Sequence, residues 1–247
     1  MADDAPEARP AWYSPAPRRW RDWFTLLHPP YTAWHLSYVL IGAGLAPHFS
    51  VERLLATLLA FGLAVGVAAH ALDELQGRPL GTKIPASTLV AVSVLSIAGA
   101  VVLGGFGVDR VGWGLAVFIV VGVGLVVVYN LELLDGRLHN GVIFALGWGS
   151  FPLLTAYFAQ ASTIRPAAVA GAVFAYGLSS AQRQLSTEAR DLRRRVLSVK
   201  GEKVYAAGLR REISKGVLLR PLEGALIKLS WCTAAVGVGL VLARTGH

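Results

Sequence analysis

The sequence predicts an all-α fold, a polytopic transmembrane helical bundle of about seven spans, with seven to nine possible. Composition is the first reason, because 54% of the residues are hydrophobic and only 15% are charged, whereas a soluble domain carries about 25% charged residues. The mean hydropathy is +0.53. The second reason is that the charges cluster where long apolar segments end. The chain also has 27 glycines, and small residues let transmembrane helices approach closely.

Each expected span is an apolar segment of roughly the length that a helix needs to cross a membrane, about 20 residues. These segments are 32–47, 51–73, 86–106, 111–130, 140–160, 166–184 and 224–243. The first is short and would have to lie tilted or where the membrane is thin. Prolines precede several spans, where their missing N–H costs nothing: Pro29, Pro30, Pro85, Pro166 and Pro221. Residues 200–222 leave room for one further surface or re-entrant helix.

The ends of the chain and its special residues complete the organisation. Residues 1–22 are polar and Pro-rich and predict a tail without a cleavable signal peptide, and residues 23–247 predict one transmembrane domain. The lone Cys232 argues against a disulfide framework. Tryptophans near the first span are expected to anchor it at the membrane interface: Trp12, Trp20, Trp23 and Trp34.

Lysine and arginine counts predict the orientation. With the N-terminus inside, eighteen of these residues fall on the cytoplasmic side and four on the opposite side, which is the bias that cytoplasmic loops show. We expect a plasma membrane of bacterial type and, for seven spans, a C-terminus on the far side. Residues 185–222 predict a basic cytoplasmic loop against anionic lipid. The net charge of +8 therefore needs no nucleic acid to explain it.

Two acidic clusters fall on the expected cytoplasmic face. His70, Asp73 and Glu74 share one face of a helix, and Gln184, Glu188 and Asp191 share a face of another. Carboxylates and substrate phosphates are the ligands that Mg²⁺ prefers, so Asp73, Glu74, Glu188 and Asp191 predict a Mg²⁺ site. Arg78, Lys83 and Arg190 would neutralise the remaining phosphate charge. Alternatively, these residues only solvate helix ends, and the acids pair with nearby arginines.

A third polar segment, 129–140, joins two expected spans. Its Gly136 turn is typical of an ordinary hairpin connection. Tyr129 and Asn130 still belong to the end of an apolar run, so we expect them to face a reactive centre.

Several segments resemble UbiA-type intramembrane prenyltransferases. Residues 28–47 read HPPYTAWHLSYVLIGAGLAP and are similar to the first span of that family. Residues 68–85, AAHALDELQGRPLGTKIP, are similar to its first Asp-rich motif and the loop that follows. YNLELLDGRLHN followed by ALGWGSFPLLTAYFA resembles the passage from the fourth to the fifth helix, and QRQLSTEARDLRRR falls where the second Asp-rich motif falls.

The resemblance implies a helical cavity that opens to lipid, where Mg²⁺ and two Asp-rich motifs bind an isoprenoid diphosphate and a lipophilic acceptor is prenylated. The first motif of the family reads N-D-x-x-D-x-x-x-D. Here His70 stands where the Asn belongs, and the last Asp is missing. The second motif would be Gln184 to Glu188 or Glu188 to Asp191. The chain is also shorter than the family by about two C-terminal spans, and fewer carboxylates imply weaker Mg²⁺ binding.

The leading functional prediction is a Mg²⁺-dependent enzyme that transfers or cyclises an isoprenoid diphosphate. Asp73, Tyr129, Asn130 and Glu188 would act in catalysis, and His70, Arg78, Lys83 and Arg190 would bind substrate. The alternative is a non-catalytic UbiA-like protein that binds a lipid or a partner subunit. A small-solute transporter would show ionisable groups at the bilayer midplane or an inverted repeat, and the sequence indicates neither.

Overall fold

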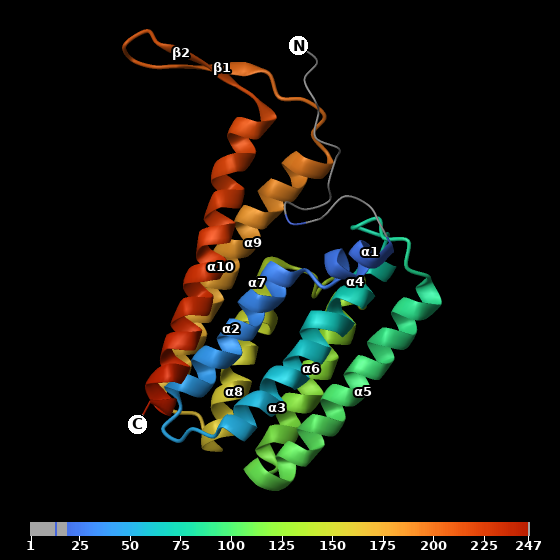
Figure 1. The fold of residues 1–247 in the computed structure, drawn as a ribbon. Helices are drawn as coiled ribbons and strands as arrows, with labels where there is room; N and C mark the ends of the chain where they lie inside the picture. The colour runs from blue at the N-terminus through green and yellow to red at the C-terminus, as the bar shows by residue number, and fades with distance from the viewer. Residues whose placement is uncertain (1–12, 14–18, 247) are drawn as a thin grey trace.

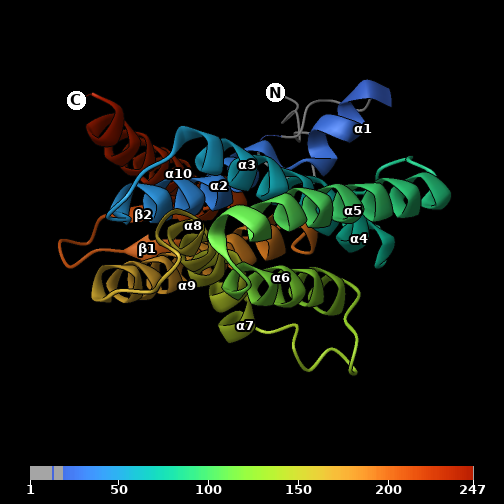
Figure 2. The same cartoon turned by 90° about the horizontal axis from the view of Figure 1, so that it is seen from below.

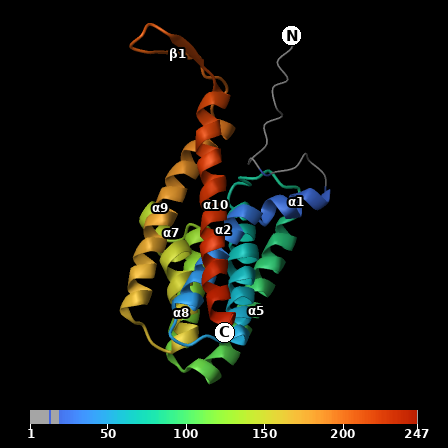
Figure 3. The same cartoon turned by 60° about the vertical axis from the view of Figure 1, so that its left-hand side comes forward.

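The structure is a computed structural model that describes residue 13 and residues 19–246. Long helices run side by side along one direction, with a small hairpin at one end and the last turn of the chain at the other (Figures 1 and 3). The elements are α1 (Arg19–Leu26), α2 (Pro29–Leu45), α3 (Val51–Phe61), η1 (Gly62–Ala69), α4 (His70–Leu75), α5 (Ala86–Val111), α6 (Gly114–Asn130), α7 (Gly141–Ala145), η2 (Leu146–Ser150), α8 (Phe151–Ala161), α9 (Pro166–Arg194), β1 (Gly201–Val204), β2 (Arg210–Ile213) and α10 (Lys215–Thr245).

The chain is mostly helical, as the composition predicts. Four helical rods are long and apolar enough to cross a membrane: Val51–Leu75, Ala86–Val111, Gly141–Ala161 and Lys215–Thr245. Helix α6 is apolar but shorter. These features are consistent with a membrane protein, while the count of seven spans stays a prediction.

Helix α2 is the central element of the bundle. In the end-on view of Figure 2 it lies between α10 and α3, with α8 beside it. Two helices approach closely at Gly42, where an added Cβ would lie 2.2 Å from the carbonyl oxygen of Leu153. Trp34 is 0% exposed and donates its indole N–H to the hydroxyl of Tyr38 at 2.7 Å. The prediction that Trp34 anchors the membrane interface is therefore wrong.

The other expected anchors are Trp12, Trp20 and Trp23. Trp20 and Trp23 are exposed, and Trp12 lies outside the described residues.

The segment after α9 forms a hairpin, not a surface helix. Strands β1 and β2 pair antiparallel, with Gly201 opposite Ile213, and Gly208 adopts a φ of +80° in the connecting turn. Helix α10 begins at Lys215, so Pro221 lies inside it and not ahead of it. The expected basic loop 185–222 thus comprises the end of α9, the hairpin and the first turns of α10.

Helices α9 and α10 extend beyond the expected spans because of packing that composition does not reveal. Beyond their apolar halves, α9 and α10 still contact one another through Ala189, Leu219 and Leu226. The Nε atom of Arg193 also donates to Oε1 of Glu223 at 2.8 Å. Both helices therefore continue through segments whose charge would end an apolar span.

Two of the rods contain π-helical segments, η1 and η2, in which the backbone turn is wider than in an α-helix. His70 follows η1 and its Nδ1 donates to the carbonyl of Gly66 at 3.1 Å. The carbonyl of Trp148, in η2, accepts from Nδ1 of His35 at 2.9 Å. π-helical segments inside α-helices are frequent at functional sites, and residues of both η1 and η2 line the apolar cavity described below.

Candidate functional site

A polar cavity lies at the end of the bundle that carries the hairpin. Its volume is about 160 Å³, the space of about five liquid water molecules. Side chains from α2, α4, α6, α7 and α9 line it, and most of its polar groups are basic or aromatic.

Helix α9 supplies the basic wall. Arg183, Arg190 and Arg194 are spaced i, i+7 and i+11, so they share one face of the helix, and all three line the cavity together with Arg193. Glu188 and Asp191 do not line it, and both are exposed. The Oδ1 atom of Asp191 lies 3.8 Å from Nη1 of Arg195 on the outer surface. The second acidic cluster is therefore not brought to the cavity.

The first acidic cluster is divided between two environments. His70 and Asp73 line the polar cavity. Glu74 is 0% exposed, and its carboxylate accepts from the backbone N–H of Leu80 at 2.9 Å and of Thr82 at 2.8 Å. The hydroxyl of Thr82 adds a third bond at 2.8 Å. Successive residues on a helix point in different directions, so Asp73 faces the cavity while Glu74 holds the following loop.

The two basic residues of that loop are also placed away from the cavity. Arg78 donates from Nη1 to the carbonyl of Ile84 at 2.6 Å, which closes the loop on itself. Lys83 is exposed, and its backbone N–H donates to Oδ2 of Asp22 at 2.9 Å. Neither residue lines the polar cavity.

Tyr129 and Asn130, at the end of α6, both line the cavity and are buried. The amide of Asn130 donates to the carbonyl of Val126 at 2.7 Å. The Tyr129 ring stacks on His139, with centroids 4.4 Å apart, and its hydroxyl accepts from Nη1 of Arg183 at 2.6 Å. The same guanidinium lies 4.8 Å from the ring centre of Phe144.

Histidines form the inner wall. The ring centroids of His28 and His70 are 4.6 Å apart, and the hydroxyl of Tyr13 hydrogen-bonds to Nδ1 of His28. His28 lies ahead of α2, outside the membrane-spanning segments, with a φ of 45° that few non-glycine residues adopt. Burial lowers the pKa of His28 well below 6.5, and the neighbouring His70 and the charges of Arg194 and Arg190 lower it further. His28 is therefore neutral at pH 7.

The predicted Mg²⁺ ligands do not form one site. Of Asp73, Glu74, Glu188 and Asp191, only Asp73 lines the polar cavity. The part of the chain that the structure describes contains no group of three or more His, Cys, Asp or Glu residues placed to hold a metal ion. The arrangement does not fit a metal centre built from those four carboxylates.

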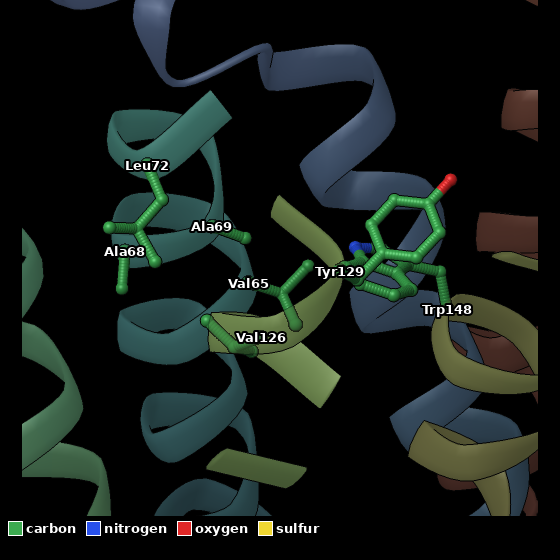
Figure 4. Close-up of a cluster of buried hydrophobic side chains, with 7 residues drawn as sticks. All are labelled: Val65, Ala68, Ala69, Leu72, Val126, Tyr129 and Trp148. Carbon is green, nitrogen blue, oxygen red and sulfur yellow. The ribbon is translucent and has the colours of Figure 1, made fainter. Parts of the chain in front are cut away.

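A second, apolar cavity of about 390 Å³ adjoins the polar cavity. It lies between the Val51–Leu75 rod, α5, α6 and α8, and its wall includes Phe61, Phe118 and Phe151. Trp148 lines both cavities. In Figure 4, Trp148 lies against Tyr129 beside a group of small and aliphatic side chains, and the Tyr129 hydroxyl points away from that group. Trp148 therefore lies where the polar cavity and the apolar cavity meet.

No protein-family model, curated protein or solved structure matches this chain.

Several cavity residues were not among the expected site residues. Arg190 was expected, but Arg183 and Arg194, on the same helix face, were not, because an excess of positive charge beside a membrane span also has a topological explanation. His35 and Trp148 stand alone within apolar segments, where no local pattern distinguishes them. Glu223 and His139 enter the cavity only through tertiary packing.

Proposed function

We propose that this chain is an integral membrane enzyme of the UbiA-like prenyltransferase type. It would bind the diphosphate of an isoprenoid donor in the polar cavity and the isoprenoid chain in the apolar cavity. The observation that carries the proposal is the meeting of an arginine-lined cavity and an aromatic-lined cavity at Trp148. Ligand sites are commonly apolar clefts of about 300–1,000 Å³ with a few placed polar groups, and the apolar cavity is within this range.

The chemistry that suits this arrangement begins with ionisation of an allylic diphosphate. The bond between the allylic carbon and oxygen breaks, and its electron pair leaves with the diphosphate. Positive groups aimed at the leaving oxygens stabilise the charge that develops there, and Arg183 and Arg190 are placed for this role. The allylic cation would remain beside Tyr129 and Trp148, because aromatic faces attract cations.

The second half of the reaction needs an acceptor and a base. A lipophilic acceptor attacks the cation, a new carbon–carbon bond forms, and the acceptor loses a proton. Asp73 is the expected carboxylate that lines the polar cavity, and in this proposal it is the base that accepts the proton. In cyclisation, a double bond of the same chain would replace the external acceptor, and Asp73 would take the proton that the cyclic cation loses.

The proposal includes a topology in which the chain crosses the membrane seven times and its N-terminus lies in the cytoplasm. The loop at residues 76–85 and the hairpin both lie at the end of the bundle that carries the polar cavity, and α10 ends at the opposite face (Figures 1 and 3). The lysine and arginine bias would then place this end in the cytoplasm, where soluble isoprenoid diphosphates are available.

The test follows diphosphate release from farnesyl and geranylgeranyl diphosphate by the purified full chain in nanodiscs, with and without Mg²⁺. Asp73→Asn and Arg190→Gln should each lower turnover by roughly a hundredfold or more, the usual cost of one charge-stabilising group. Glu188→Gln is the matched control, because Glu188 is an exposed α9 residue outside the cavity, and it should keep full turnover. Equal losses in the Glu188 and Asp73 variants, or no release from either donor, would refute the proposal.

The second candidate is a non-catalytic protein that binds an anionic lipid. It is favoured by the failure of the four expected carboxylates to meet. Tight binding of farnesyl diphosphate without release of diphosphate under any of these conditions would support this reading.

A further inference from the structure

The charge of the polar cavity differs from that of a site built on acidic motifs. Four guanidinium groups line it, against two carboxylates among the described residues, Asp73 and Glu223. Glu223 is already paired with Arg193, whose Nη2 lies 2.5 Å from Oε1. The cavity therefore has an excess of positive charge.

That excess has two consequences for ligands. A divalent cation would be repelled by the guanidinium groups, and Mg²⁺ usually relies on one or more carboxylates in addition to phosphates. A phosphate would be attracted, because the planar fork of arginine matches two phosphate oxygens at once. Burial and the neighbouring His70 lower the pKa of His28 most, and the charges of Arg194 and Arg190 lower it further.

Arg190 is the residue best placed to meet a ligand. It lines the cavity, is exposed to solvent, and makes a 3.3 Å hydrogen bond to the hydroxyl of Thr187. No ion pair joins it to a carboxylate among the residues that the structure describes. Arg183 lies seven residues, about two turns, earlier on the same face of α9, and its guanidinium is oriented by Tyr129.

We propose that the arginine face of α9, Arg183 with Arg190 and Arg194, binds the diphosphate directly and without a divalent metal ion. This inference rests on the proposed function, because it names how the same site holds its donor. It also explains why the second acidic cluster is free to face outward on α9.

The experiment measures binding of farnesyl diphosphate to the full chain in phosphatidylcholine nanodiscs, in EDTA and in Mg²⁺. We expect the dissociation constants in the two conditions to agree within about threefold. Arg190→Gln should weaken binding at least tenfold in EDTA, and Arg190→Lys should lose less because it keeps the charge. Arg195→Gln is the matched control, since Arg195 is exposed on the same helix end and lies near Asp191. Unfolding midpoints of all variants establish that each one is folded.

The outcomes separate the two proposals. Binding that requires Mg²⁺ would overturn the metal-free site and leave the prenyltransferase proposal standing. No binding in either condition would overturn both. If phosphatidylglycerol in the nanodisc displaced farnesyl diphosphate as well as unlabelled farnesyl diphosphate does, the site would bind phosphate without metal. Its ligand would then be a lipid headgroup, which would contradict the proposed function. Equal weakening by Arg190→Gln and Arg195→Gln would overturn the assignment to the cavity face.

Discussion

Arg183 donates a hydrogen bond of 2.6 Å from Nη1 to the hydroxyl of Tyr129, and this bond joins α9 to α6 across the polar cavity. The two residues lie 54 positions apart in the chain. The bond orients a guanidinium in the cavity wall and also places the Tyr129 ring against Trp148, with centroids 4.4 Å apart. One contact therefore organises both the basic wall of the polar cavity and its junction with the apolar cavity at Trp148.

Replacing Tyr129 with Phe should destabilise the protein. A hydrogen bond to a charged group contributes about 1.5–3 kcal/mol, and Phe would leave the Arg183 guanidinium without this partner. Thermal unfolding in detergent should therefore show a lower midpoint. Tyr176→Phe is the control, because the hydroxyl of Tyr176, on α9, makes no hydrogen bond to any described residue. Identical midpoints for the two variants would count against the role given to this bond.

Glu74 should prove to be a structural residue. Removing its carboxylate in Glu74→Ala leaves two backbone N–H groups without acceptors, at about 1–3 kcal/mol for each buried group. We expect a large drop in the unfolding midpoint that is the same in EDTA and in Mg²⁺. Glu188→Ala, at an exposed position, should leave the midpoint unchanged. A Glu74→Ala protein that is stable but has lost a Mg²⁺ response would instead restore this residue to a metal site.

The pH dependence of stability should reveal the lowered pKa of His28 in the folded protein. Its pKa in the folded protein lies well below the 6.5 of an unfolded chain. Between these values the unfolded state binds more protons, so stability is complete above about pH 6.5 and falls as the pH is lowered. The slope for one proton is about 1.4 kcal/mol per pH unit.

The measurement compares unfolding midpoints at pH 8 and pH 5.5 for the natural chain and His28→Asn. Asparagine tolerates the φ of 45° at this position but does not titrate, so the variant should lose less stability on acidification. The same loss in both proteins would show that His28 is already protonated in the fold.

Topology can be tested with single cysteines, because Cys232 is the only cysteine in the chain. In a Cys232→Ser background, Lys203→Cys in the hairpin and Ser162→Cys between α8 and α9 should be labelled from opposite sides of the membrane. An impermeant thiol reagent applied to intact cells should label position 162 and spare position 203. Labelling of both from the same side would contradict the seven-span count.

The sequence predicted the positions of the apolar helices well, because hydropathy is a property of each segment by itself. It also predicted Asp73, Tyr129 and Asn130 as catalytic residues and His70 and Arg190 as substrate-binding residues, and these five line the polar cavity. The rest depended on which way a helix faces. Glu188 and Arg190 are two positions apart on α9, yet one is outside the cavity and the other lines it. That difference arises from the packing of α9 against α10, α7 and α2, which no local pattern encodes.

The length of α9 and α10 was underestimated for a related reason. Their charged halves extend away from the apolar bundle, and the two helices stabilise one another there through Leu219, Leu226 and the Arg193–Glu223 pair. Hydropathy alone treats such a segment as a loop. Hydropathy also left room for a surface or re-entrant helix at residues 200–222, where residues 201–213 form the hairpin instead.

The most direct test of the central claim is a structure of the full chain in nanodiscs with a farnesyl diphosphate analogue in which sulfur replaces the bridging oxygen. We predict the two phosphates against Arg183 and Arg190 in the polar cavity, and the isoprenoid carbons beyond Trp148 among Phe61, Phe118 and Phe151. Phosphates found at the other end of the apolar cavity, beside Arg53 and Arg110, or a chain bound only on the outer surface of the bundle, would contradict it.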